Sequence, residues 1–228
     1  MIATKGIDTV VAEDNQLWLA MWKNQQTDFH QPLVNRHLQE YWHRLKVPNM
    51  GRVLVPLCGK SNDLLWLAAR GFEVIGIELS SLAVKAFFKE NQLKPKKTRS
   101  GHFTIWRHGR IRILCGDIFL LKHTHLGQID AVYDRAALTA LAEPARKRYV
   151  RKLLSLMPLL KPILLLTTED VDPLRTQDSV ALVDQEIFDL FSPHFAIAVS
   201  YGDTYPVAFS PATVNKVYQM KRLTAATD

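Results

Sequence analysis

Three charged side chains lie where predicted apolar strands end, at positions suited to ligand binding. Glu78, Asp117 and Arg135 each close or closely follow a short apolar run. The carboxyl ends of parallel strands meet at one crevice in a doubly wound sheet, so we expect these side chains to share one ligand site. A carboxylate there accepts hydrogen bonds from hydroxyl or amino groups, and a guanidinium holds an anion or a polar ring atom.

Residues 52–80, RVLVPLCGKSNDLLWLAARGFEVIGIELS, predict the elements that position the first of these acids. The run VLV is typical of a strand buried on both faces. A turn with Leu57 and Gly59 follows, then an amphipathic helix, then a second strand that carries Glu78 at its end. Strand, glycine turn, helix, strand and acid form the pattern that binds adenosine-containing cofactors.

The spacing within this pattern indicates which cofactor it suits. Glu78 lies 19 positions after Gly59, near the ~20 expected between a glycine turn and a ribose-binding acid. The turn has one glycine, whereas a pyrophosphate needs several so that backbone N–H groups can approach it. We therefore predict a nucleoside cofactor without a diphosphate, such as S-adenosylmethionine. An ordinary strand-helix-strand unit with an exposed Glu78 is the alternative.

Several motifs resemble those of the thiopurine S-methyltransferase family. In the core they are PLCGKS, a helix ending ARG, EVIGIELS and AVKAFF. Near the N-terminus the pattern W-x3-W-x6-F-H, followed by a V-N pair, is also similar to the family's. The residues in that register are Trp18, Trp22, Phe29, His30, Val34 and Asn35. The resemblance is close from Trp18 to Met157, and the segments 170–180 and 201–215 depart from it.

The resemblance implies a set of site residues. It implies an N-terminal helical lid that closes over S-adenosylmethionine, with aromatic faces near the sulfonium, which a π-face attracts. The acceptor-positioning residues it implies are Arg135, Phe29 and His30. The cofactor-binding residues it implies are Trp18, Trp22, Phe29, Leu57, Gly59, Glu78, Asp117, Ile118 and Arg135.

Plainer interpretations of the same residues stay open at this point. The two tryptophans, four positions apart on one helix face, would also serve to cover a sheet edge. Asp117 would serve as a helix or turn cap. Arg135 would form a salt bridge to Asp134 or Asp117, and His30 would simply pack between helix and loop.

The length and pattern predict one α/β domain. The 228 residues, 47% of them hydrophobic, suit a single domain over residues 1–228, with a lid over 1–50 and an α/β core over 51–228. We predict a doubly wound, mostly parallel seven-stranded sheet of the Rossmann-like methyltransferase type. His108-Gly109 indicates a hairpin turn, and residues 92–101 are expected to be a basic linker.

Charge and cysteine content limit the partners. The net charge is +7, and the basic residues cluster over 85–112, which predicts a solvated face, with substrate steering and nucleic-acid binding as alternatives. Cys58 and Cys115 give no disulfide framework. The histidines form no convincing metal-ligand pattern, so no metal is expected. We expect a cytoplasmic protein, a monomer, with no membrane span.

The predicted reaction is methyl transfer from S-adenosylmethionine to a small-molecule thiol, either thiopurine-like or a selenium or tellurium compound. Such a displacement needs alignment and water exclusion more than a strong base. A nucleic-acid or other small-molecule methyltransferase is one alternative, although Asp134-Arg135-Ala136-Ala137 replaces the N-P-P-Y-type motif of amine methylation. A cofactor-binding protein with a lost acceptor site is the other, because the segment 170–180 differs from the family pattern.

Overall fold

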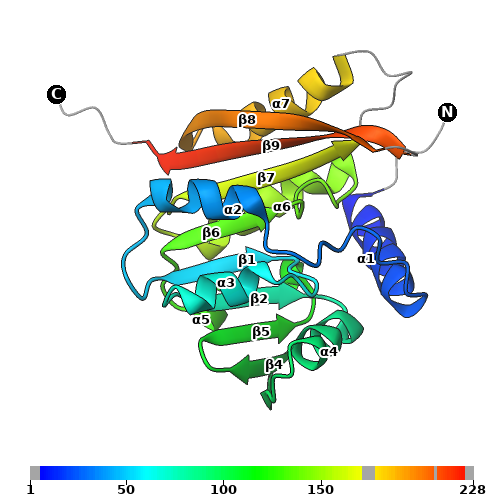
Figure 1. The fold of residues 1–228 in the computed structure, drawn as a ribbon, viewed down its shortest axis with the longest axis vertical. Coiled ribbons are helices and arrows are strands. Elements are labelled where there is room, and N and C mark those ends of the chain that lie inside the picture. The colour runs from blue at the N-terminus through cyan, green and yellow to red at the C-terminus, as the bar shows by residue number, and fades with distance from the viewer. Residues whose placement is uncertain (1–5, 171–177, 208–209, 224–228) are drawn as a thin grey trace.

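The computed structural model describes residues 6–170, 178–207 and 210–223, and within them nine strands form one sheet (Figure 1). The strands are β1 (Arg52–Pro56), β2 (Glu73–Glu78), β3 (Lys96–Ser100), β4 (Phe103–His108), β5 (Ile111–Cys115), β6 (Ala131–Arg135), β7 (Ile163–Asp170), β8 (Phe195–Val207) and β9 (Ser210–Arg222). Their order across the sheet is β3-β4-β5-β2-β1-β6-β7-β9-β8.

The sheet is mixed, so the prediction of seven mostly parallel strands was wrong. The central strands β5, β2, β1, β6 and β7 pair in parallel. At one end β3 pairs antiparallel with β4 and β4 with β5. At the other end β9 pairs antiparallel with both β7 and β8. The doubly wound core is therefore extended by an antiparallel pair on each side.

The unpredicted strand is β3, which replaces the expected basic linker. Its sequence KKTRS has no apolar alternation, because every residue of this edge strand is exposed. It forms by backbone pairing with β4 alone. A charged, exposed edge strand is a common way to block pairing with another chain.

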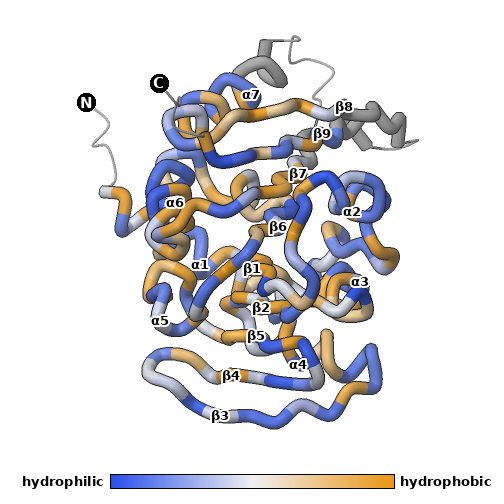
Figure 2. The backbone as a smooth tube through the Cα atoms, turned by 90° about the vertical axis from the view of Figure 1, so that its left-hand side faces the viewer, coloured by the Kyte–Doolittle hydropathy of each residue, from blue (hydrophilic) through white to orange (hydrophobic). Residues whose placement is uncertain are grey.

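Helices cover both faces of the sheet and give three layers (Figure 2). One apolar cluster joins the sheet to α1, α5, α6 and α7, and a second joins it to α2, η1, α3 and α4 on the opposite face. The helices are α1 (Ile7–Lys23), α2 (Arg36–Tyr41), η1 (Trp42–Leu45), α3 (Asp63–Ala69), α4 (Ser81–Glu90), η2 (Ile118–Leu120), α5 (His123–Leu126), α6 (Glu143–Leu156) and α7 (Asp178–Phe191).

Local sequence explains several helix starts. The Asn35 side chain accepts hydrogen bonds from the first backbone N–H groups of α2, and Ser80 caps α4 in the same way. Pro144 occupies the first turn of α6, where its missing N–H is not needed. No helix among the described residues is long and apolar enough to cross a membrane.

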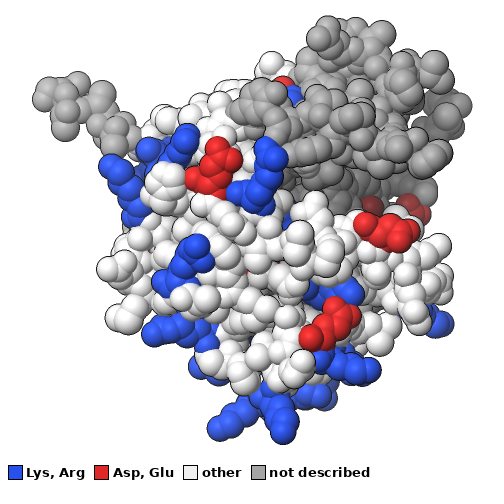
Figure 3. Space-filling view, viewed as in Figure 1, with Lys and Arg blue, Asp and Glu red and all other residues white. Residues whose placement is uncertain are grey.

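Cations collect on the β3–β4 end of the molecule, the lower end in Figure 3. Strand register places Lys96 opposite Arg107, and Arg107 opposite Arg112 on β5. The three side chains form one row across three strands, because residues paired directly across a sheet lie on the same face. The basic cluster of the sequence is thus partly a row of like charges on one sheet face.

Candidate functional site

The parallel strands bring most of the predicted site residues to one edge of the sheet. Leu57 and Gly59 follow β1, and Glu78 ends β2. Asp117 lies two residues after β5, and Arg135 ends β6. Because β5, β2, β1 and β6 are neighbours in that order, these carboxyl ends lie side by side at one edge of the sheet, the position of the ligand crevice in doubly wound folds.

The Glu78 carboxylate binds the turn after β1. It is buried, and its Oε2 accepts a hydrogen bond from the Gly59 N–H at 2.8 Å, while its Oε1 accepts one from the Ser80 N–H at 2.7 Å. Burial raises the pKa of Glu78, and these backbone hydrogen bonds oppose the rise. A third backbone N–H, that of Leu79, also acts on this carboxylate. Two carboxylate oxygens offer about four acceptor positions, so Glu78 can still accept from a ligand hydroxyl group.

Two of the six non-glycine residues with positive φ among the described residues lie at the same edge of the sheet. Gly59 has φ +52°, in the left-handed region that favours glycine. Leu57 and Ala136, directly after β1 and β6, have φ values of 46° and 57° although neither is glycine. Strained non-glycine residues of this kind cluster at functional sites.

Helix α1 and the loop after it lie beside the crevice (Figure 1). The rings of Trp18 and Trp22 both contact Phe29 edge to face, at centroid distances of 5.3 and 5.5 Å. Trp22 is buried against the Gly59 turn, since a Cβ added at Gly59 would lie 3.4 Å from its ring. The Trp18 indole N–H donates to the Ala140 carbonyl at 3.0 Å. The aromatic side chains therefore adjoin the cofactor turn, while closure of the segment as a lid stays a prediction.

Asp117 acts as a cap in this structure, as the plainer interpretation expected. Its Oδ1 accepts from the Phe119 N–H at 2.8 Å at the start of η2, and its Oδ2 accepts from the Asn15 side chain of α1 at 3.1 Å. Ile118 beside it is buried in the apolar core. Asp117 thus ties α1 to the strand end where an adenine was expected.

Arg135 pairs with Asp63, so the predicted salt-bridge partners Asp134 and Asp117 were wrong. Its Nη1 donates to Asp63 Oδ2 at 3.0 Å. Asp134 turns into the core instead, where its carboxylate accepts from the Tyr149 hydroxyl at 2.6 Å and from the N–H groups of Ala137 and Leu138. The arginine therefore remains at the crevice with one N–H group engaged by an acid from α3.

Sequence reasoning missed Asp63. Its position in the first turn of α3 suggested only a favourable interaction with the helix dipole. The structure buries it completely and surrounds it with three donors from two segments, Asn35 before α2 and the pair Tyr133 and Arg135 on β6. The only local signal is an acid inside an otherwise apolar helix start.

His30 lies among charges of both signs at the edge of the site. Burial and then the nearby Lys60 charge lower the pKa of His30, with Arg135 adding a smaller effect in the same direction, while Glu90 and Asp63 oppose the lowering. Lys60 itself pairs with Glu90 at 2.9 Å. The lowered pKa keeps the imidazole neutral, with a lone pair open to a proton, and also makes it a weaker base.

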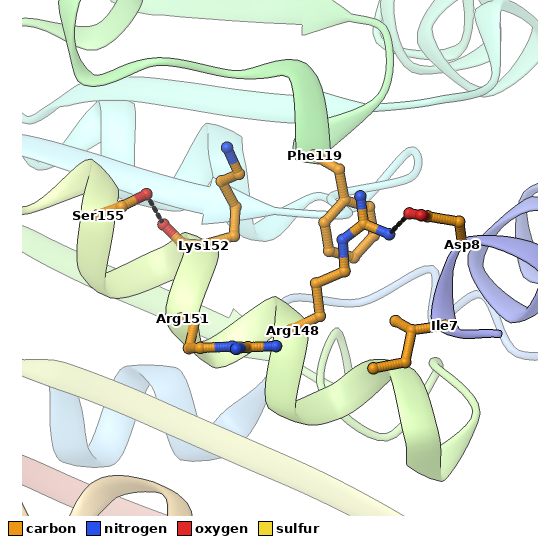
Figure 4. Close-up of a pocket in the computed structure, with 7 residues that line it drawn as sticks. All are labelled: Ile7, Asp8, Phe119, Arg148, Arg151, Lys152 and Ser155. Carbon is orange, nitrogen blue, oxygen red and sulfur yellow. Dashed lines mark hydrogen bonds and ion pairs between the residues drawn. The ribbon is translucent and has the colours of Figure 1, made fainter.

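The cysteine thiols and one surface pocket are separate from this chemistry. Burial raises the pKa of Cys58, and it raises that of Cys115 to about 11, so both thiols are protonated and unreactive at neutral pH. A surface pocket of about 460 Å³ lies between α1, η2 and α6 (Figure 4). Its lining contains none of the predicted site residues; it consists of Ile7, Asp8, Phe119, Arg148, Arg151, Lys152 and Ser155. Among the described residues there is no group of three or more His, Cys, Asp or Glu suited to a metal ion.

Comparison with known proteins identifies the family. The model of the family "Thiopurine S-methyltransferase" matches residues 13–222. The chain belongs to the thiopurine S-methyltransferase family. A thiopurine S-methyltransferase of Stutzerimonas stutzeri (strain A1501) is 48% identical over 212 residues, covering 91% of this chain and 90% of the relative. One from Pseudomonas fluorescens (strain Pf-5) is 44% identical over 170 residues, 75% of this chain and 77% of the relative.

Membership in the thiopurine S-methyltransferase family makes this protein an S-methyltransferase that uses S-adenosylmethionine. The match reaches past Met157, so the family relation includes the C-terminal third. The segment 171–177, which holds most of the departing loop, lies outside the described residues, as do the side chains of 201–214.

Solved structures confirm the fold. A Burkholderia thailandensis 1,6-didemethyltoxoflavin-N1-methyltransferase, solved with that substrate and S-adenosylhomocysteine, superposes with a TM-score of 0.65 at 14% identity, over 98% of this chain and 93% of its own. A methyltransferase from Anabaena variabilis gives a TM-score of 0.64 at 13% identity, over 92% and 95% of the two chains. At these identities the likeness shows the methyltransferase fold alone.

Proposed function

We propose that this thiopurine S-methyltransferase family member methylates a small-molecule thiol that binds at Arg135. The observation that carries the proposal is the state of that guanidinium. Its Nη1 is held by Asp63, with a longer contact of 3.5 Å to Gln31, and no hydrogen bond from Nε or Nη2 to another described residue is found. A planar fork anchored at one corner in the ligand crevice is suited to bind an anionic or polar acceptor. A thiopurine-like thiol, or a selenium or tellurium compound, fits this chemistry.

The residues of the crevice fit the cofactor. Glu78 would accept from the ribose hydroxyls with the acceptor capacity that its backbone partners leave, and the single-glycine turn at Gly59 suits a cofactor without a diphosphate. Ile118 would pack on the adenine, and Asp117 would accept from the adenine amino group in exchange for one of its present partners. Leu57 completes the turn, and Trp18, Trp22 and Phe29 cover the sulfonium side. The related fold from Burkholderia thailandensis holds S-adenosylhomocysteine, which supports this assignment.

The chain's side chains then have separate tasks in the reaction. When bound, S-adenosylmethionine would supply a methyl group on its sulfonium: the acceptor sulfur would form a bond to the methyl carbon as the bond from that carbon to the sulfonium breaks, and the demethylated cofactor would leave. Arg135 orients the acceptor and favours its thiolate form. His30, whose lowered pKa keeps it neutral, takes the thiol proton when the acceptor binds protonated. The aromatic side chains exclude water.

A panel of thiols and variants of Arg135 test the proposal. With the best acceptor from the panel, Arg135→Ala should lower kcat/KM about tenfold or more, since each 1.36 kcal/mol of lost stabilisation is tenfold. Arg135→Lys should restore only part of it, because a point charge cannot reproduce a planar fork. Steady-state kinetics in both substrates provide the measurement.

Arg146 provides the matched control. It is ion-paired at 2.6 Å to Glu186, and its side chain is 18% exposed against 17% for Arg135. Arg146→Ala should leave the acceptor KM unchanged. If Arg135→Ala has wild-type kinetics, Arg135 forms only a structural salt bridge and does not bind the acceptor.

A monomeric state, a cytoplasmic location and the single-domain organisation stay predictions from the sequence.

A further inference from the structure

We propose that Asp63 is the positioning residue of the acceptor site, and that its buried carboxylate holds Arg135 and the N-terminal segment 31–35 in one arrangement. The proposal rests on the proposed function, because it assigns a partner to the arginine that binds the acceptor. It concerns a residue that touches neither substrate and acts through its neighbours.

The burial of Asp63 requires that its charge be matched. Its relative exposure is 0%, and a buried carboxylate is tolerated only when donors surround it. Its Oδ2 accepts from the Tyr133 hydroxyl at 2.9 Å and from Arg135 Nη1 at 3.0 Å. Its Oδ1 accepts from the Asn35 backbone N–H at 2.8 Å. Arg135 supplies the only positive charge among these three partners, so it is the group that balances the buried negative charge.

The bond to Asn35 connects this pair to the N-terminal segment. Asn35 uses its own side chain to cap α2, which fixes its backbone. Asn62, one residue before Asp63, donates from its side-chain amide to the Pro32 carbonyl oxygen at 2.7 Å. The segment that follows Phe29 and His30 is therefore attached to the start of α3 at two points. One short stretch of α3 thus determines where that segment and the arginine lie relative to each other.

This arrangement prepares Arg135 for its acceptor. A free arginine side chain samples many rotamers, whereas one whose Nη1 is bound to a rigid, buried acid presents the rest of its fork in a single orientation. Groups held in the productive geometry before binding reduce the entropy lost on binding. The acceptor KM should therefore depend on Asp63, while cofactor affinity, which depends on Glu78 and the Gly59 turn, should not.

The decisive variant is Asp63→Asn. The amide oxygen can still accept from the Asn35 N–H, but the amide nitrogen places a donor opposite the donor of Arg135. We expect the acceptor KM to rise about tenfold or more, with the dissociation constant for S-adenosylmethionine within about threefold of wild type. Acceptor kinetics at saturating cofactor and calorimetry of cofactor binding separate the two effects, and saturating cofactor also keeps the variant folded.

Two companion variants identify the cause. Tyr133→Phe removes a neutral donor from the same oxygen and leaves the ion pair intact, so it should lower the melting temperature with the acceptor KM nearly unchanged. Asp63→Glu keeps the negative charge but moves it by one methylene, so its acceptor KM should lie between those of wild type and Asp63→Asn. In an Arg135→Ala background, Asp63→Asn should cause no further rise, because the two residues act as one unit.

The outcomes distinguish this inference from the proposed function. An acceptor KM at the wild-type value in whichever of Asp63→Asn and Asp63→Glu folds overturns the positioning role. So does a parallel loss of cofactor and acceptor affinity, which indicates a general structural role. If Arg135→Ala raises the acceptor KM but Asp63→Asn does not, the inference fails and the proposed function stands. If Arg135→Ala itself has no effect, the acceptor assignment fails.

Discussion

Glu78 serves folding and ligand binding through one carboxylate. Glu78→Gln should weaken S-adenosylmethionine binding by about 1.5–3 kcal/mol, because hydrogen bonds from hydroxyl groups to a charged acceptor are lost. It should also lower stability, since an amide has one acceptor oxygen where two backbone N–H groups, those of Gly59 and Ser80, now bind. Calorimetry measures the first effect and thermal unfolding the second.

Glu73 is the matched control for Glu78 because it lies on the same strand. It begins β2, is exposed, and pairs with Arg52 at 2.7 Å away from the crevice. Glu73→Gln should leave cofactor affinity unchanged. Equal affinities in the Glu78→Gln and wild-type proteins would mean that another acid binds the ribose.

Asp134 makes stability depend on pH. Burial raises its pKa to about 6, from an ordinary value of 3.8, against the opposing hydrogen bonds from Tyr149, Ala137 and Leu138. Between pH 4 and 6 the native state therefore holds a proton that the unfolded state releases, and stability falls as the pH rises through this window. Asp134→Asn does not titrate, so its stability relative to wild type should increase by on the order of 2–3 kcal/mol from pH 4 to 6 and then stay constant.

Denaturant unfolding at several pH values measures this difference. In the wild type the Tyr149 hydroxyl stabilises the charged form of Asp134 and so lowers its pKa. Tyr149→Phe removes this hydrogen bond, so the pKa of Asp134 should rise and the upper end of the pH window should move to higher pH. A difference between Asp134→Asn and wild type that is constant from pH 4 to 8 would show that Asp134 titrates in its ordinary range.

Residue by residue, the sequence predicted positions at strand ends better than it predicted hydrogen-bond and ion-pair partners. Gly59 and Glu78 belong to one local pattern, and their spacing fixes their separation once the strands pair. The partner of Arg135 lies 72 positions away on a helix, and no periodicity shows which of several acids will meet a given arginine. Asp117 was placed correctly after its strand end. The sequence pattern could not show whether its carboxylate would cap the following turn, as it does here, or contact a ligand.

Among the elements, the row Lys96, Arg107 and Arg112 should destabilise the β3–β4–β5 end. Like charges directly opposite in a sheet repel, by roughly 0.2–1 kcal/mol a pair. Arg107→Glu converts two repulsive pairs into attractive ones, so it should raise stability at low salt by about 0.5–2 kcal/mol, and the gain should shrink as salt screens the charges. Arg110→Glu, in the adjoining turn and outside the row, is the control and should give a smaller gain. A gain of the same size for both would show a general effect of net charge.

Local signals predicted the elements well wherever apolar residues alternate or a capping residue is present. The predicted hairpin at His108-Gly109 is confirmed, and Ser80 and Pro144 stand at helix starts as their side chains favour. Strand β3 was missed because an edge strand exposed on both faces has no apolar pattern to detect. Helix α1 begins at Ile7, and most residues of its first two turns are exposed.

For the whole molecule, bound cofactor should stabilise the fold. S-adenosylmethionine at 100 times its dissociation constant should raise the free energy of unfolding by about 2.7 kcal/mol, because it binds the native state alone. NAD should give no shift, since a single-glycine turn does not suit a diphosphate. Chemical denaturation with each ligand tests both statements. Stabilisation by NAD without stabilisation by S-adenosylmethionine would overturn the cofactor assignment.

The position of β9 bears on how the protein is made. β9 lies between β7 and β8 in the sheet, yet it is the last of the nine strands to be synthesised. Until β9 leaves the ribosome, one edge of β7 is unpaired. Strand β7 carries the core residues Ile163, Leu164, Leu165 and Leu166. Nascent chains that stop before residue 210 would present an apolar, unpaired strand edge to other chains. The arrival of β9 therefore protects the open edge of β7, and a chaperone has most to shield just before that strand emerges.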